Sequence, residues 1–351
     1  MLKTLTERPG AWRALRATGI AGGPGIGRTR RLWRLAVTAV VVLGLLLWWL
    51  LPVGDDASPS GSVTVTTGVR TGVYARYGEL LKDHLDEDLP RLRVNLMPSE
   101  GSVQNIRRLV AGEASFTIAT ADAVATYRDE GGDGAHRLRA CARLYDDYLQ
   151  LVVPAGSTVR RAADLAGKRV AIGQPGSGVS LIAERLLTAA GLDPEKDLTP
   201  VPVGISEMTT LMRKGKIDAF FWSGGLPTGA VLDLAKRYPI RLVQLGDLVD
   251  RVHKLGGAKH YYRAAVMPAD AYPMVQRGQA IKTIAVANLL VTTDGTDRTL
   301  TESVTRTVIN SRDKIGESVH AAQRVDLRTA IYTDPLTLHE GAKRYYRSVK
   351  P

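Results

Sequence analysis

Hydrophobic positions after residue 60 alternate between two periods, which predicts a succession of strands and helices. Residues 63–68 form a β-branched run that ends in glycine, residues 77–89 place leucines at helical spacing, and residues 116–120 form another apolar run. The same rhythm continues through residues 169–243. Because strands that alternate with helices build sheets covered by helices, we expect an α/β fold with a parallel or mixed sheet.

The most hydrophobic stretch lies near the N-terminus and predicts a transmembrane helix. Residues 35–53 carry no charged side chain and are long enough to cross a bilayer as a helix. Excess arginine marks the cytoplasmic flank of such a helix. We therefore expect a basic cytoplasmic segment at residues 1–34 and a single-pass anchor in the cell membrane, with the C-terminal domain extracytoplasmic. A cleaved signal peptide is the alternative, but it ends in small residues, whereas Trp48 and Trp49 stand here.

The composition is that of a folded protein without covalent cross-links. Of the 351 residues 44% are hydrophobic, and Cys141 is the single cysteine, so no internal disulfide and no paired-thiolate metal site can form. The net charge is +12, but residues 1–34 carry eight basic side chains against Glu7, and the remaining excess is diffuse. Without a concentrated basic stripe or a recognition motif, we expect no nucleic-acid partner.

Motifs for catalysis and for cofactors are absent from the sequence. The six histidines are scattered, and neither a zinc-protease motif nor a nucleophile elbow occurs. Residues 173–180, GQPGSGVS, resemble a phosphate-binding loop, but Val179 stands where such a loop carries lysine. Asp146 and Asp147 are adjacent, which indicates a turn or an edge strand rather than a catalytic pair, because neighbouring strand residues point to opposite faces. We expect no enzyme, no metal and no cofactor.

Four glycine-rich turns each join the end of an expected strand to the start of an expected helix. They span residues 66–74, 98–105, 173–180 and 222–229. Glycine allows close backbone approach, and the free N–H groups of a helix start favour an anion. One exposed helix start contributes only ~0.3–1 kcal/mol, so several must converge for tight binding. The turns therefore predict an anion site only if the fold brings them together.

Five motifs in this order resemble the TAXI family, the extracytoplasmic solute-binding components of tripartite ATP-independent periplasmic (TRAP) transporters. The matching stretches are TGVRTGVYARYG (67–78), SEGSVQNI (99–106), GQPGSGVS (173–180), DAFFWSGGLPT (218–228) and PLTLHEGAKRYYR (335–347). The resemblance implies a type II periplasmic-binding-protein fold, with two lobes, a hinge and an interlobe cleft, preceded by one N-terminal transmembrane helix.

The resemblance also implies a division of the chain and a function. After a linker at residues 54–61, lobe 1 would combine residues 62–153 with 260–351, and lobe 2 would hold residues 154–259. The implied function is a membrane-anchored solute-binding protein. It would capture a small organic anion, either an amino acid such as glutamate or another carboxylate, for a TRAP-type permease. The alternative is an extracytoplasmic sensor that uses the same cleft and signals through a membrane partner.

Carried over to this sequence, the motifs supply hydroxyl, amide and backbone donors and one apolar wall. The candidate ligand-binding residues are Thr71, Gly72, Tyr74, Arg76, Ser99, Gly101, Ser102, Asn105, Thr120, Asp122, Pro175, Gly176, Ser177, Gly178, Ser180, Trp222, Gly224 and Gly225. The serines of these turns could instead cap helices. Arg76 and Glu100 depart from the family pattern, and they could either change the ligand preference or pair with each other.

Overall fold

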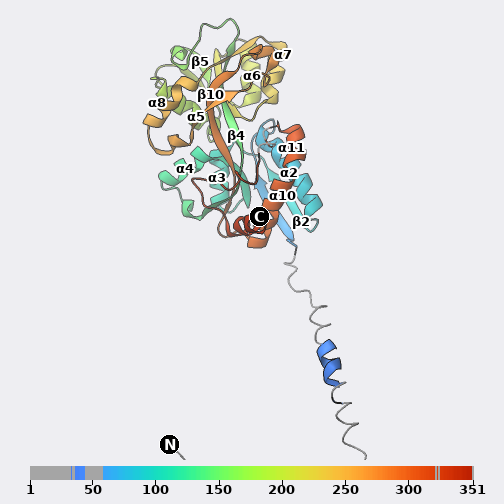
Figure 1. Cartoon of the computed structure of the whole chain (residues 1–351). Helices are drawn as coiled ribbons and strands as arrows, with labels where there is room; N and C mark the ends of the chain where they lie inside the picture. Colours follow the sequence, from blue (N-terminus) through green and yellow to red (C-terminus); the bar gives the residue numbers. More distant parts are fainter. Residues whose placement is uncertain (1–32, 34–35, 44–57, 321, 323–324, 350–351) are drawn as a thin grey trace, which may run out of the picture. The chain divides into compact units, whose positions relative to one another are not determined.

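The structure, a computed structural model, describes residues 33, 36–43, 58–320, 322 and 325–349 (Figure 1). The chain divides into two units, residues 1–57 and residues 58–351. Within the described residues no helix is both long and apolar enough to cross a membrane, and residues 36–43 are helical. The rest of the expected anchor, nearly all of the basic segment and half of the expected linker lie outside the described residues, so the anchor and the localisation remain predictions.

One mixed sheet organises the unit formed by residues 58–351. Its order is β2-β1-β3-β10-β4-β7-β5-β6, while β8 pairs with β4 and β9 pairs with β10. The described strands are β1 Gly61–Thr66, β2 Leu92–Met97, β3 Phe116–Thr120, β4 Leu138–Pro154, β5 Arg169–Ala171, β6 Thr199–Val201, β7 Ala219–Gly224, β8 Ile240–Val243, β9 Arg263–Met267 and β10 Ile281–Thr293. The ladders of β1 with β2 and β3 and of β5 with β6 and β7 are parallel, and those of β4 and β10 are antiparallel. The expected α/β fold with a mixed sheet is confirmed.

Helices cover the sheet, and most of them bury apolar side chains. On the helix at residues 73–88, Leu81 and Leu85 are four residues apart and both buried, as the leucine spacing predicts. The described α-helices are α2 Val73–Asp88, α3 Ser102–Val110, α4 Ala121–Asp129, α5 Gly178–Ala189, α6 Ile205–Arg213, α7 Gly229–Arg237, α8 Val249–Lys254, α9 Pro273–Gln276, α10 Arg298–Asn310, α11 Arg312–Ser318 and α12 Glu340–Ser348. Short 3₁₀ turns are η1 Ala135–Arg137, η2 Ala162–Leu165, η3 Gly246–Leu248 and η4 Gly257–Tyr261.

Hydrophobic packing separates this unit into two parts. Two clusters draw their buried side chains from residues 63–145 and 289–346, and two others from residues 149–286. We call these parts lobe 1 and lobe 2. The change occurs inside β4 and β10, the two long strands that run side by side from the helices of one lobe to those of the other (Figure 1).

The clusters place one segment differently from the expected division. The resemblance assigns residues 260–351 to lobe 1, whereas Tyr262, Met267 and Ile284 pack in the clusters of lobe 2. The physical reason is that β9 pairs with the first part of β10, so both extend the sheet of lobe 2 before β10 continues into lobe 1. Local sequence patterns do not reveal where a long strand exchanges its neighbours.

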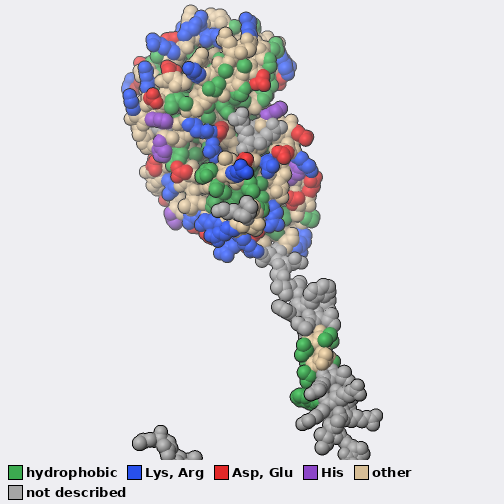
Figure 2. Space-filling model, in the orientation of Figure 1, with side chains coloured by type: hydrophobic (Ala, Val, Ile, Leu, Met, Phe, Trp, Pro, Cys, Tyr) green, Lys and Arg blue, Asp and Glu red, His purple; other side chains and the backbone are tan. Residues whose placement is uncertain are grey.

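The surface of the folded unit carries both signs of charge. On the face drawn in Figure 2, Lys and Arg side chains lie among Asp and Glu side chains, with one gathering of basic side chains near the lower end of that unit. This pattern differs from a continuous basic stripe that would follow a nucleic-acid backbone. The expected absence of a nucleic-acid partner stays a prediction.

Candidate functional site

The four glycine-rich turns meet at one cleft between the lobes. The cleft has about 610 Å³ of empty volume, part of which is open to solvent. Lobe 1 lines it with Gly68, Val69, Gly72, Val73, Tyr74, Glu100, Gly101, Ser102 and Thr120. Lobe 2 lines it with Gly173, Gln174, Ser177, Gly178, Val179, Gly204, Ile205, Met208, Trp222, Ser223 and Gly224, and Asp147 lies where the lobes join. The condition set by the sequence, that several helix starts converge, is therefore met.

Five helices begin at this cleft, because their N-cap residues all line it. These residues are Gly72 of α2, Gly101 of α3, Thr120 of α4, Ser177 of α5 and Gly204 of α6. Of these five residues only Ser177 caps its helix with its side chain. Its hydroxyl accepts a hydrogen bond from the Ser180 N–H at 3.1 Å. N–H groups of a first helical turn lack intrahelical acceptors, and the helix dipole adds positive potential there. Main-chain N–H donors and a positive potential from several helices therefore meet at this cleft.

Glycine brings the two lobes close together at this point. A Cβ atom on Gly101, whose φ is +132°, would lie 3.3 Å from the Ser177 Cα atom of the other lobe. A Cβ atom on Gly178 would lie 3.2 Å from the Ser102 hydroxyl. Because a side chain would fill the gap, glycine lets the backbones of α3 and α5 approach the same ligand volume.

Asp147 is the buried carboxylate of the cleft. The residue is 4% exposed, and both of its carboxylate oxygens accept hydrogen bonds from neutral groups. The Asn288 amide donates to Oδ1 at 2.8 Å, and the Ser223 hydroxyl donates to Oδ2 at 3.2 Å. Burial raises the pKa of Asp147 to about 7, although these two hydrogen bonds oppose the rise. Asp147 can therefore change its charge near neutral pH.

The sequence analysis missed Asp147 and misplaced its segment. Asp146 and Asp147 lie inside the 17-residue strand β4, not in a turn or an edge strand. The expectation that they have opposite orientations agrees with their partners, since Asp146 forms ion pairs with Arg143 and Arg263 while Asp147 lines the cleft. The signal that could have placed these residues inside the sheet is the length of the strand segment, residues 138–154, because an edge strand is rarely 17 residues long.

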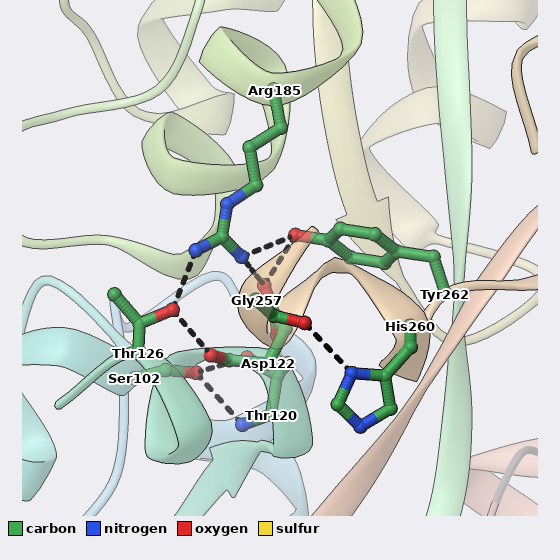
Figure 3. Close-up of polar contacts among 8 residues, drawn as sticks. All are labelled: Ser102, Thr120, Asp122, Thr126, Arg185, Gly257, His260 and Tyr262. Atoms are coloured by element: carbon green, nitrogen blue, oxygen red, sulfur yellow. Dashed lines mark hydrogen bonds and ion pairs between the residues drawn. The ribbon is translucent and has the colours of Figure 1, made fainter. Parts of the chain in front are cut away.

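Tyr74 and Asn288 connect Asp147 to the helix starts of lobe 1. The Tyr74 hydroxyl donates to the side-chain oxygen of Asn288 and lies 3.2 Å from the Ser102 hydroxyl. Ser102 Oγ in turn accepts from the Thr120 N–H at 3.2 Å, and Figure 3 shows these two residues side by side. Burial raises the pKa of Tyr74 well above its usual value, so the phenol stays neutral. Asn288, fully buried on β10, is a second residue that the sequence did not single out.

Half of the residues proposed from the sequence line the cleft. They are Gly72, Tyr74, Gly101, Ser102, Thr120, Ser177, Gly178, Trp222 and Gly224. The others lie outside its lining, namely Thr71, Arg76, Ser99, Asn105, Asp122, Pro175, Gly176, Ser180 and Gly225. The ligand-binding roles of all these residues remain predictions.

Several of the residues outside the lining shape the turns instead. The Asn105 amide is fully buried and donates to the carbonyl oxygens of Thr67 and Ile118. The Ser99 hydroxyl donates to the Thr67 carbonyl oxygen and accepts from the Gly101 N–H. These bonds hold the first two turns against each other, so the sequence correctly placed the polar groups near the cleft but not their direction.

Arg76 does not face the ligand volume. Its guanidinium lies 3.2 Å from Glu79 on the exposed side of α2, so the expected alternative of a pair with Glu100 is not formed. Glu100 itself lines the cleft, where its side chain is exposed. Within the described residues no Lys, Arg or His lines the cleft, and its charged side chains are two carboxylates, Glu100 and Asp147.

Two contacts join the lobes at the cleft rim. The hydroxyl groups of Thr71 in lobe 1 and Ser206 in lobe 2 lie 2.8 Å apart. The Gln104 N–H donates to the Gly176 carbonyl oxygen at 3.1 Å. Thr71 and Gly176, both proposed as ligand contacts, therefore bridge the lobes in this structure.

Asp122 forms an interlobe ion pair rather than part of the cleft (Figure 3). Its Oδ2 atom lies 3.2 Å from the Arg185 guanidinium of α5 and accepts from the Tyr262 hydroxyl at 2.5 Å. Arg185 also donates to Tyr262 at 2.9 Å and to the Thr126 hydroxyl at 2.5 Å. Asp122 is fully buried, so a cation of lobe 2 compensates an anion of lobe 1.

The family of the chain follows from its sequence profile. The profile of the NMT1-like family matches residues 65–349. The chain belongs to the NMT1-like family. The matched region of this NMT1-like chain contains all of lobe 2, nearly all of lobe 1 and every residue that lines the cleft.

Solved structures of binding proteins resemble the NMT1-like chain at low sequence identity. The periplasmic aliphatic sulphonate binding protein SsuA from Escherichia coli is 13% identical, with 84% of each chain covered and a TM-score of 0.47. A putative L-cystine ABC transporter protein from Listeria monocytogenes is 14% identical, with 76% of this chain and 98% of that chain covered and a TM-score of 0.46. An ancestral arginine-binding protein bound to arginine is 15% identical, with 74% and 98% covered and a TM-score of 0.47. Likenesses at this level do not distinguish one ligand class from another.

Proposed function

We propose that this chain is a solute-binding protein that captures a small organic carboxylate, such as an amino acid, between its lobes. The observation that carries the proposal is the convergence of five helix N-termini on one interlobe cleft. Main-chain N–H groups bind a carboxylate without contributing a reactive side chain. The lining offers hydroxyls, amides and two carboxylates, which supports binding rather than catalysis as its role.

The finer assignment rests on the sequence motifs. Membership of the NMT1-like family agrees with a solute-binding role, and the five motifs favour the TAXI type, with a type II periplasmic-binding-protein fold and a TRAP-type permease as the partner. The apolar, uncharged stretch at residues 35–53 favours a membrane anchor that keeps the binding unit outside the cytoplasm. A sensor would use the same cleft and would signal through a membrane partner instead of a permease.

The test is thermal unfolding of the full chain, purified in mild detergent, against a panel of amino acids, carboxylates and sulfonates. A ligand at about 100 times its Kd stabilises a protein by ~2.7 kcal/mol, which raises the unfolding temperature measurably. We expect at least one carboxylate of the panel to do so. No response from any member would contradict the proposal.

A pair of glycine variants locates the binding site. Gly101→Ala adds a side chain between the two lobes, whereas Gly112→Ala places an equally small group at a left-handed position, φ +78°, with no atom nearby. Both variants strain the backbone, so both lower the unfolding temperature without ligand. We expect only Gly101→Ala to lose the ligand response. Equal responses from the two variants would place the binding site elsewhere.

A further inference from the structure

The charges of the cleft do not match a ligand that is only an anion. Five helix starts attract a negative group, yet the lining contains the carboxylates of Glu100 and Asp147 and, within the described residues, no cationic side chain. Glu100 is exposed, so water screens its charge. Asp147 is buried, so its charge acts on any ligand in the cleft at close range.

Asp147 has hydrogen-bonding capacity that the protein leaves open. An ionised carboxylate accepts about four hydrogen bonds. The structure gives this one two, from Asn288 and Ser223, both neutral donors. Buried carboxylates are normally paired with a cation, because burial without one is costly. The charged groups that act most on Asp147 from its surroundings, Asp146 and Asp122, are both acidic.

Nearby guanidinium groups are already engaged with other carboxylates. Arg143 and Arg263 form ion pairs with Asp146, and Arg185 forms one with Asp122. These pairs neutralise the two acidic neighbours but place no cation on Asp147. No described side chain supplies a cation to Asp147, so a cation at this carboxylate would come from the ligand.

The rest of the lining indicates what else the ligand carries. Apolar side chains form much of the wall, namely Val69, Val73, Val179, Ile205, Met208 and Trp222. A second carboxylate on the ligand, as in glutamate, would face either this wall or Asp147. An uncharged side chain would instead bury apolar surface there, at roughly 25 cal/mol per Å².

We propose that the cleft selects a zwitterion, an amino acid with an uncharged apolar side chain, and that Asp147 binds its ammonium group while the helix starts bind its carboxylate. This rests on the proposed function and narrows its ligand class. Asn288 and Ser223 act as positioning residues, since each holds one oxygen of the Asp147 carboxylate. Tyr74 in turn holds Asn288.

The experiment compares three matched probes on the full chain by titration calorimetry at pH 8. Leucine carries both charged groups, 4-methylpentanoate lacks the amine, and 3-methylbutylamine lacks the carboxylate. Loss of one partner of a buried charge pair typically costs at least 2 kcal/mol. We therefore expect leucine to bind about 30-fold or more tightly than either analogue. This comparison needs no variant, so it holds whether or not a substituted protein folds.

Asp147→Asn keeps the shape of the side chain and removes its charge. We expect leucine binding to weaken about 30-fold or more, and 4-methylpentanoate binding to stay equal or to strengthen. Glu100→Gln is the matched control, because it removes the other carboxylate of the lining, which is exposed. We expect it to change leucine binding less than about threefold.

The outcomes separate this inference from the proposed function. If 4-methylpentanoate binds as tightly as leucine, or if Asp147→Asn leaves leucine binding unchanged, the role of Asp147 is refuted while carboxylate binding stands. If Glu100→Gln weakens leucine binding as much as Asp147→Asn, the general field of the cleft is responsible and the inference is wrong. If no amino acid, carboxylate or sulfonate binds, both proposals fail.

Discussion

Two aspartates of this protein are buried to almost the same extent, but their hydrogen-bond and charge partners differ. Asp122 is fully buried beside Arg185, and the Tyr262 hydroxyl donates to the same oxygen. Asp147 is 4% exposed, and its partners are the neutral groups of Asn288 and Ser223. The first lies on α4 and contacts Arg185 of α5, while the second lines the cleft.

The difference lies in where the compensating charge comes from. For Asp122 the protein supplies the cation from the other lobe, although the Asp122 Oδ1 atom has no hydrogen-bond partner within the described residues. For Asp147 the protein supplies only hydrogen bonds, and its pKa rises to about 7 because burial disfavours the ionised form. A strongly shifted titratable group in a cleft is a sign of a functional site. The following predictions compare the two carboxylates in order of decreasing effect.

Removing the cation from the Asp122 pair gives the largest expected effect. Arg185→Met leaves a buried carboxylate without its counter-charge, which costs about 3–5 kcal/mol of unfolding free energy. Urea unfolding measures this change. The control is Arg76→Met, which breaks the exposed pair with Glu79 and costs less than about 1 kcal/mol. Similar losses in both variants would mean that the interlobe ion pair contributes no more than a surface pair.

Removing the charge of Asp147 is expected to increase the unfolding free energy of the ligand-free protein, whereas removing Arg185 lowers it. The pKa of Asp147 rises from 3.8 to about 7 on folding. Between pH 3.8 and pH 7 the Asp147 carboxyl is therefore protonated in the folded protein and ionised in the unfolded chain. Ionisation above pH 7 therefore costs the ligand-free protein up to about 4 kcal/mol, and this cost is absent below pH 3.8. We expect Asp147→Asn to raise the urea midpoint at pH 8 and to have little effect at pH 4.

A destabilised Asp147→Asn protein at pH 8 would contradict this account. It would mean that Asn288 and Ser223 already compensate the carboxylate in the ligand-free protein. Asp122→Asn is the matched variant, because the same change beside Arg185 leaves a buried cation unpaired and is expected to destabilise.

The pH dependence of ligand affinity comes next in size. An ammonium group needs the ionised form of Asp147, so leucine affinity should be constant above pH 7 and fall about tenfold per pH unit below it. The other titratable groups around Asp147 are Tyr74 and Tyr145, whose pKa values burial raises so that both phenols stay neutral, and Asp146 and Asp122, which form ion pairs. Calorimetry at pH 5 to 8 measures the slope. Asp147→Asn should remove it, and a slope of opposite sign would mean that leucine binds better when Asp147 is neutral, which would contradict an ammonium contact with Asp147.

The smallest effect is expected from Tyr74→Phe. This change removes the hydroxyl that donates to Asn288 and leaves both carboxylates in place. One hydrogen bond contributes about 1 kcal/mol, so leucine affinity should fall about fivefold. Tyr127→Phe, which removes a hydroxyl bonded to the Asp133 carbonyl oxygen away from the cleft, serves as the control. Equal effects on binding would exclude a role for Tyr74 in positioning Asn288.

Local patterns in the sequence predicted the elements and the four turns, because period and glycine content depend on residues close together in the chain. The sequence pointed to the cleft only through the glycine-rich turns. It did not predict that Asp147 and Asn288 lie there, since they are 141 residues apart and neither belongs to a motif. Asp122 was proposed as a ligand contact for the same reason: nothing near it in sequence indicates Arg185 or Tyr262.

The place of Asp147 on its strand has a mechanical consequence. Among the described residues, β4 and β10 carry the chain from one core to the other, between residues 145 and 149 and between residues 286 and 289. Their register shifts between Ala287 and Leu289. If the lobes rotate against each other, the bending axis passes through this point. Atoms on an axis scarcely move, whereas a turn that does not adjoin β4 or β10, such as residues 173–180, moves with its lobe. The Asp147 carboxylate would then keep its position during the rotation, so that a solute could contact it before the glycine-rich turns close on the solute.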